Sequence, residues 1–160
     1  MRPTETLHEA LFLHEPRLPE ERSCSMCLIK WNKFYAVNIK ELDDQHKKLI
    51  DLINQMYSAM KAGKGKEALS TVLTELVRYT VYHFETEERI LLQYGYAEYE
   101  AHKGMHDDLT RRTNELKNQL DRGNNLIMMD VMLFLSNWLN IHILEVDKKY
   151  GPYLISKGIK

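Results

Sequence analysis

Five histidines between residues 46 and 142 are the side chains best suited to chemistry in this sequence of 160 residues, which has 7 histidines in all. Each histidine continues a stripe of apolar residues at helical spacing, so it lies on the apolar face of its own predicted helix. The carboxylate Glu87 continues one of these stripes, and Asp147 follows His142 after the end of another. Burying such groups without partners would cost several kcal/mol each, so we expect them to satisfy one another. The set is His46, His83, Glu87, His102, His106, His142 and Asp147.

This set of donors predicts a metal centre. Five imidazoles and two carboxylates are too many for one ion, whereas two octahedral ions offer about twelve coordination positions. The imidazoles fill five, two bridging carboxylates fill four, and a shared oxide or hydroxide fills two, which leaves one position open for a small ligand. Nitrogen and oxygen donors without thiolate suit iron ions and argue against an iron–sulfur cluster, which needs cysteine thiolates. Structural zinc is disfavoured because zinc prefers four ligands.

Each piece of the pattern also has a simpler interpretation. The pair His102 and His106 could be solvated on a helix surface, and a single histidine on an apolar face is usually hydrogen-bonded within the core. Glu87 near His83 could be an ordinary contact along one helix face. Convergence favours the metal centre, because His46 and Glu87 lie towards opposite ends of their helices, as antiparallel packing requires of residues at one level.

Four long apolar patterns must position these side chains. The patterns begin near residue 38, where Asn38 and Glu41 form a capping-box pattern, and continue over 66–93, 97–121 and from 126 to just before Gly151-Pro152. The connections are short, and no alternating strand pattern is longer than a few residues. The sequence therefore predicts an all-α fold, an antiparallel up-down-up-down four-helix bundle with an N-terminal extension.

The first 27 residues differ from the rest of the chain. They hold three of the four prolines and both cysteines, and only the capping-box pattern of Thr6 and Glu9 predicts a short helix there. We expect residues 1–27 to form a loosely attached extension and residues 28–160 to form the bundle.

Composition and charge exclude several classes of protein. Lysine and arginine number 22 and aspartate and glutamate 23, and this net charge of −1 disfavours a nucleic-acid binder. The pair Cys24 and Cys27 forms a C-x-x-C, but a second cysteine pair that would complete a zinc site is missing. The most apolar stretch, 126–146, has too many polar groups for membrane insertion, and no secretory signal is visible. We expect a cytoplasmic protein.

Four segments surround the candidate ligands with characteristic neighbours: LDDQHKKL at 42–49, HFETEE at 83–88, HKGMH at 102–106 and WLNIHILEVD at 138–147. Together they resemble the hemerythrin family, and within it the single-domain bacterial members, over about residues 28–151. The resemblance implies a saturated iron held by three histidines: His102, His106 and His142. It implies that His46 and His83 hold the open iron and that Glu87 and Asp147 bridge the two ions.

The function that the resemblance implies is reversible O2 binding by a protein that is not an enzyme, as both Fe2+ ions become Fe3+. Apolar residues beside the ligands are the candidates for a dry O2 pocket, although core packing explains them equally well. They are Leu49, Phe84, Trp138 and Leu144. The sequence identifies no protein partner.

Three alternatives stay open. The first is a di-iron enzyme that handles peroxide or nitric oxide, although oxygen-activating bundles typically use Glu-x-x-His motifs and more carboxylates. The second is a sensor or redox partner in which residues 1–27 report the state of the iron. The third is a metal-free bundle with stacked histidines, which the cost of burying charge disfavours.

The spacing between His142 and Asp147 makes a further prediction. Five residues of a regular α-helix turn by about 140°, so the two side chains would not share a face. We expect a widened turn between them, of the kind often found at functional sites.

Overall fold

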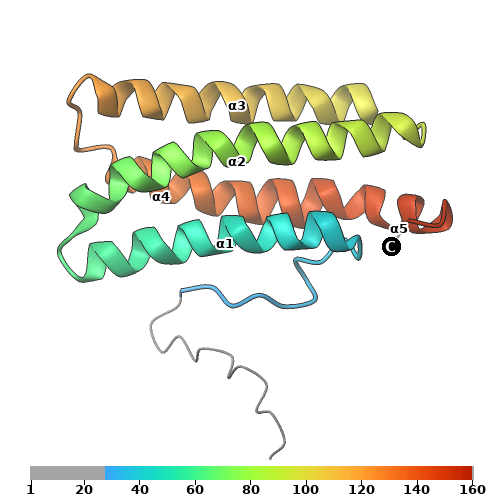
Figure 1. Cartoon of the computed structure of the whole chain (residues 1–160), viewed down its shortest axis with the longest axis horizontal. Helices are drawn as coiled ribbons and strands as arrows, with labels where there is room; N and C mark the ends of the chain where they lie inside the picture. Colours follow the sequence, from blue (N-terminus) through green and yellow to red (C-terminus); the bar gives the residue numbers. More distant parts are fainter. Residues whose placement is uncertain (1–27, 160) are drawn as a thin grey trace, which may run out of the picture.

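The structure, a computed structural model, describes residues 28–159 of the chain. Its helices are α1 (Lys40–Lys61), α2 (Gly65–Gln93), α3 (Tyr99–Asp121), α4 (Met128–Asn137), the π-helix η1 (Trp138–Asp147) and α5 (Lys148–Ser156). The last three follow one another without a break and form the fourth rod of the bundle. Successive rods run in opposite directions, and residues 28–159 contain no β-strand (Figure 1). The predicted up-down-up-down four-helix bundle is confirmed.

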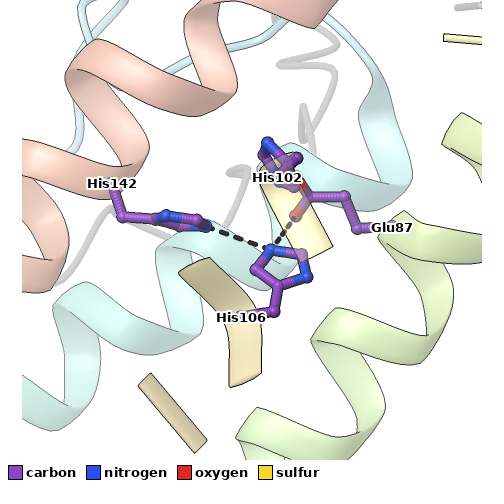
Figure 2. A group of neighbouring side chains, drawn as sticks. All are labelled: Glu87, His102, His106 and His142. Carbon is purple, nitrogen blue, oxygen red and sulfur yellow. Dashed lines mark hydrogen bonds and ion pairs between the residues drawn. The ribbon is translucent and has the colours of Figure 1, made fainter. Parts of the chain in front are cut away.

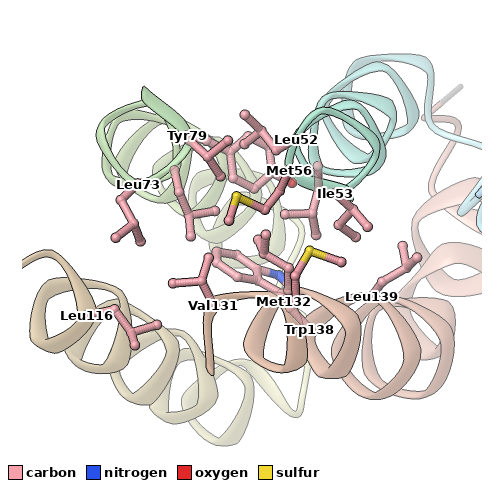
Figure 3. Packing of buried hydrophobic residues seen from close by; sticks show 14 of the residues in the cluster. Leu52, Ile53, Met56, Leu73, Tyr79, Leu116, Val131, Met132, Trp138 and Leu139 are labelled. Carbon is pink, nitrogen blue, oxygen red and sulfur yellow. The ribbon is translucent and has the colours of Figure 1, made fainter. Parts of the chain in front are cut away.

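Two apolar clusters fill the bundle, and side chains of the larger one pack between the helices (Figure 3). A smaller cluster contains Leu42, Ile90 and Tyr150. Burying a leucine or isoleucine side chain contributes about 1.5–3 kcal/mol relative to leaving it exposed, so these stripes hold the helices together. On α1, residue 46 falls between Leu42 of the smaller cluster and Leu49 of the larger one. On α1, the predicted ligand position therefore lies where the two apolar clusters meet.

The start of α1 differs from the capping box that the sequence predicts. The N-cap residue is Ile39, and its side chain caps nothing. Asn38 instead has a φ of 63°, in the left-handed region. The Asp43 carboxylate accepts hydrogen bonds from the backbone N–H groups of Val37 at 2.7 Å and Asn38 at 3.1 Å. The Asn38–Glu41 prediction is wrong because a carboxylate one turn inside the helix reaches back to the preceding segment.

The fourth rod extends beyond the end that the sequence predicts. Gly151 and Pro152, which are expected to stop the helix, both lie within α5. A Cβ atom on Gly151 would lie 2.8 Å from the backbone carbonyl oxygen of Val37. The glycine therefore makes room for a neighbouring backbone, a tertiary reason that the local sequence does not reveal. Pro152 is exposed, and its ring costs this rod one helical hydrogen bond.

The widened turn between His142 and Asp147 is confirmed. Both residues lie in η1, whose π-helical hydrogen bonds join residues five apart. The two side chains therefore point to the same side of the rod, and both are buried: His142 is 4% exposed and Asp147 is 0% exposed.

Residues 28–39, called the arm here, run back along the bundle beside α1 (Figure 1). The Asn54 side chain accepts a hydrogen bond from the N–H of Ile29 at 2.9 Å and donates one to its carbonyl oxygen at 2.8 Å. At the other end of the arm, Lys148 Nζ donates to the carbonyl oxygens of Ala36 and, at 3.4 Å, Lys33. The arm therefore links the middle of α1 to the residue that follows η1.

Two predictions about the extension lie outside the described residues: the capping box of Thr6 and Glu9, and the C-x-x-C of Cys24 and Cys27. Within residues 28–159, none of the helices combines the length and the apolar character needed to cross a bilayer.

Candidate metal centre

All four rods bring predicted ligands to the end of the bundle at which α5 lies. Helix α1 contributes one of them, α2 two, α3 two and η1 two. None is more than 4% exposed to solvent. They are His46, His83, Glu87, His102, His106, His142 and Asp147.

The first group of donors comprises Glu87, His102, His106 and His142 (Figure 2). Their donor atoms all lie within 4.8 Å of one another. Glu87 Oε1 lies 2.7 Å from His102 Nε2, and the Nε2 atoms of His106 and His142 are 3.1 Å apart. Two imidazole nitrogens at this distance share at most one proton, and a cation between such lone pairs would relieve their repulsion.

The second group comprises His46, His83, Glu87 and Asp147, with donor atoms again within 4.8 Å of one another. His46 Nε2 lies 3.3 Å from Asp147 Oδ2, and His83 Nε2 lies 3.2 Å from Glu87 Oε2. This group has two imidazoles, whereas the first has three. The two groups therefore differ by one in their number of imidazole donors.

The two carboxylates lie between the groups. Glu87 directs Oε1 to His102 and Oε2 to His83. Asp147 directs Oδ2 to His46 and Oδ1 to His142, which lies 3.2 Å away. One oxygen of each carboxylate thus faces each group, and this is the arrangement that a carboxylate bridging two cations requires.

Burial keeps most of the imidazoles neutral, because a charged ring loses its hydration inside the bundle. It lowers the pKa of His83 to about 3, of His106 to about 2 and of His142 to about 4. The pKa of His46 is also lowered by burial. A neutral imidazole offers a lone pair, so these four rings are prepared as metal ligands at neutral pH.

The carboxylates and His102 behave differently. Burial is the largest single effect on the pKa of His102 and lowers it. The hydrogen bond to Glu87 and the negative charges of Glu87, Asp147 and Glu88 together outweigh burial, so the net shift of this pKa is upward. Burial alone would raise the pKa of Glu87, yet the hydrogen bond from His102 and the nearby imidazoles hold it well below its usual range. Burial and the charge of Glu87 raise the pKa of Asp147 well above its usual range. A bound cation must therefore displace a proton from this site.

Unpaired polar atoms test whether the site fits metal ions. His46 Nε2, His83 Nε2, Glu87 Oε2 and both carboxylate oxygens of Asp147 are buried, and within residues 28–159 none of them has a hydrogen bond of normal geometry. Buried polar groups are nearly always satisfied, so such a cluster needs an explanation. Two cations, one within each group of donors, would give all five atoms a partner, and the residues therefore fit a pair of metal ions.

Two polar residues beside the ligands were not assigned a role from the sequence. Gln45 Oε1 lies 2.8 Å from His83 Nδ1, and Glu88 Oε1 lies 2.9 Å from His106 Nδ1. Each precedes or follows a ligand directly in the chain, but its partner lies on another helix. Their position next to a ligand is a weak signal, and only the packing of the helices reveals the pairs.

Three of the four predicted O2-pocket residues belong to the main apolar cluster: Leu49, Phe84 and Trp138. The Phe84 ring stacks on His106 with 3.7 Å between centroids, and it lies 5.2 Å from the Trp138 ring. Leu144 lies on η1 and is partly exposed. Aromatic rings thus cover one side of the centre, whereas Leu144 lies near the surface.

The comparison with protein families decides the relationship. The family described as Hemerythrin HHE cation binding domain matches residues 37–154, a range that includes all seven donors. The chain belongs to the hemerythrin family. The predicted resemblance is thereby confirmed, and the description of the domain as cation-binding agrees with the donor set.

Hemerythrins with assigned names and solved structures resemble most of the chain. Bacteriohemerythrin from Methylococcus capsulatus is 35% identical over 130 residues, which cover 81% of this chain and 98% of that protein. Bacteriohemerythrin from Pseudomonas aeruginosa is 33% identical over 125 residues, or 78% of this chain and 80% of that one. A crystal structure of wild-type hemerythrin superposes with a TM-score of 0.71 at 34% identity, covering 79% of this chain and 98% of that chain. A hemerythrin mutant gives 0.73 at 33% identity.

Proposed function

We propose that this protein binds O2 reversibly at two iron ions, one held by each group of donors. The observation that carries the proposal is the pair of carboxylates, each with one oxygen towards each group. The unequal number of imidazoles in the two groups supports one saturated ion and one ion with a free position. Bacterial relatives named bacteriohemerythrin support a hemerythrin-type iron protein.

In this proposal His102, His106 and His142 hold the saturated ion. His46 and His83 hold the open one, and Glu87 and Asp147 bridge. A bound pair of Fe2+ ions would supply two electrons, one from each ion, which is the number that reduces O2 to the level of peroxide. The protein contributes neutral imidazoles, a carboxylate that is ionised and a second, Asp147, that gives up its proton on binding the metal.

The apolar residues around the centre exclude water. Phe84 stacks on His106 of the first group, Trp138 packs against Phe84, and Leu49 is 0% exposed on α1. Dry surroundings suppress the entry of protons and water, which promote irreversible oxidation. We assign Leu144 to the same pocket as its outer residue. A carrier needs such shielding because it must return its ligand unchanged.

The first experiment is a metal analysis together with visible spectra of the reduced protein, recorded without air and again after air is admitted. We expect about two irons per chain, a colourless reduced form and a coloured form that loses its colour when O2 is removed. Two irons that oxidise once and never release O2 would favour the enzyme or sensor alternatives. A protein without bound metal would contradict the proposal.

A variant tests the assignment of the ligands. His83→Ala removes one of the two imidazoles of the second group, so we expect the loss of about one iron per chain and of the reversible colour. Cys24→Ser, at a position that precedes the described residues and is not a predicted ligand, is the control and should retain both. Normal oxygenation of the His83 variant would show that His83 does not hold the open ion.

A further inference from the structure

Gln45 occupies an unusual position for an uncharged polar residue. It lies on α1 directly before His46, yet its side chain turns towards α2 and only 6% of the residue is exposed. Its Oε1 lies 2.8 Å from Nδ1 of His83, 38 residues away in the chain. This contact reaches the second group of donors, the one with two imidazoles.

The contact fixes which nitrogen of His83 carries the proton. An amide oxygen only accepts hydrogen bonds, so Nδ1 must be the protonated nitrogen. The Nε2 lone pair then points towards Glu87 Oε2, which lies 3.2 Å away and is itself unpaired. A metal ligand needs this tautomer. If the amide were reversed, its NH2 group would require the lone pair on Nδ1, and Nε2 would carry a proton towards the metal.

The other end of the amide faces a different environment. Gln45 Nε2 is buried and has no hydrogen-bond partner within residues 28–159. Gln45 also lines a surface pocket of about 600 Å³ between α1 and α2, together with four charged residues and two tyrosines: Lys40, Glu41, Asp44, Lys48, Tyr79 and Tyr82. Gln45 therefore lies between a polar, solvent-facing pocket and His83.

The corresponding partner in the first group carries a charge. Glu88 Oε1 lies 2.9 Å from Nδ1 of His106. A carboxylate draws the Nδ1 proton more strongly than an amide does, which makes the ring a stronger electron donor to a metal. The two groups thus differ both in the number of imidazoles and in the residue that supports one of them.

We propose that Gln45 is a positioning residue for the open metal ion. It holds His83 in the Nδ1-protonated tautomer, and as a neutral acceptor it keeps the reduction potential of the centre higher than a carboxylate would. This inference rests on the metal centre of the proposed function. The chemistry separates the two roles, because a leucine removes the acceptor, whereas a glutamate keeps an acceptor and adds a charge.

The experiment compares Gln45→Leu, Gln45→Glu and Asn54→Leu in the full-length, iron-loaded protein. Asn54 is the matched control, since it is another hydrogen-bonded amide on α1 but contacts the backbone of Ile29. The measurements are iron per chain, the rate of Fe2+ loss to a chelator without air, and the midpoint potential. We expect Gln45→Leu to weaken retention of one iron by 10–100-fold. We expect Gln45→Glu to keep both irons with a more negative potential, and Asn54→Leu to keep both the irons and the wild-type potential.

Other outcomes would overturn the inference. Wild-type iron retention in Gln45→Leu would show that His83 needs no support, and an unchanged potential in Gln45→Glu would show that the charge of the partner has no effect. Equal iron loss in Asn54→Leu and Gln45→Leu would reduce Gln45 to a general stabilising role. Each of these results leaves the proposed function intact when the wild-type protein binds two irons and O2. Absence of iron in the wild type contradicts the proposed function itself.

Discussion

Burial changes the pKa of the individual histidines at the candidate metal centre, and this links the stability of the protein to pH. Buried imidazoles lose hydration, and four of the five have a lowered pKa for that reason. The unfolded chain, in contrast, protonates its histidines near their ordinary pKa of about 6.5. Acid therefore favours the unfolded state of the metal-free protein, because that state takes up protons that the folded state rejects.

The first prediction concerns the metal-free protein. We expect its free energy of unfolding to fall as the pH is lowered from about 6.5 to about 5, since His83, His106 and His142 stay neutral down to pKa values of about 3, 2 and 4. Each proton taken up on unfolding changes the stability by about 1.4 kcal/mol per pH unit. Urea unfolding at several pH values measures this slope.

Two residues act in the opposite direction and set the size of the effect. His102 and Asp147 have raised pKa values, so the folded state binds their protons more tightly and loses that stabilisation as the pH rises. Four lowered imidazoles outweigh these two groups in the acidic range. A stability that stays constant or increases on acidification would contradict the prediction, and His142→Gln should reduce the slope by about one proton.

At the scale of residues, the seven donors that the sequence predicts as ligands lie in two neighbouring buried groups. Their role as metal ligands stays a prediction. The signal in the sequence was polar residues on or next to apolar stripes, where a buried polar side chain needs a partner. The roles of Gln45 and Glu88 cannot be predicted from such stripes. Each pairs with a histidine on another helix, and the rotation of one helix against the next decides that contact. The spacing within one helix contains no information about it.

Among the elements, the fourth rod shows that a tertiary contact can explain a residue that the local sequence would assign to the end of a helix. Glycine followed by proline normally ends a helix. Here Gly151 lies under the arm, where the Val37 carbonyl oxygen leaves no room for a Cβ atom. The arm is also joined to this rod by Lys148, which immediately follows Asp147.

The second prediction tests this close approach. Gly151→Ala should destabilise the protein by about 1–3 kcal/mol, because the new methyl group must push against backbone rather than a flexible side chain. Gly104→Ala is the matched control on α3, where a Cβ would meet nothing within 4 Å, and it should be neutral or stabilise by up to about 1 kcal/mol. Chemical unfolding compares the two variants. Equal effects of the two substitutions would contradict the steric explanation.

The elements divide into those that local sequence determines and those that it does not. The boundaries of α2 and α3 follow the apolar period and the glycines that end it, and the π-helical segment follows from the five-residue spacing of two buried ligands. The arm contacts the fourth rod at Lys148 and Gly151, and its backbone is bound by Asp43 at the start of α1. Such contacts between segments distant in sequence are the part that local patterns could not predict.

For the whole molecule, the proposed metal pair acts as a cross-link among four rods. It binds donors that are close together only in the folded bundle, so its binding free energy adds to the stability of the fold. The metal-free protein keeps the two apolar clusters, which do not need the ions. The fold should therefore persist without metal but melt earlier.

The third prediction follows directly. Removal of iron by a chelator should lower the melting temperature by on the order of 10 °C, since a ligand at 1,000 times its dissociation constant adds about 4 kcal/mol. Adding Fe2+ without air should restore the original value. Melting curves followed by circular dichroism give both numbers. Identical melting with and without iron would show that the four rods are not linked through the metal.

The distribution of donors over all four rods also orders events during synthesis. His46 lies in the first helix and Asp147 in the last rod, so about a hundred residues of chain separate two members of one group. At about 5–20 residues per second, a ribosome needs several seconds or more to add them. His46 is therefore synthesised several seconds before Asp147, the other member of its group in the last rod. The donor set for the proposed metal pair is consequently complete only after the final rod, which carries His142 and Asp147, has been added.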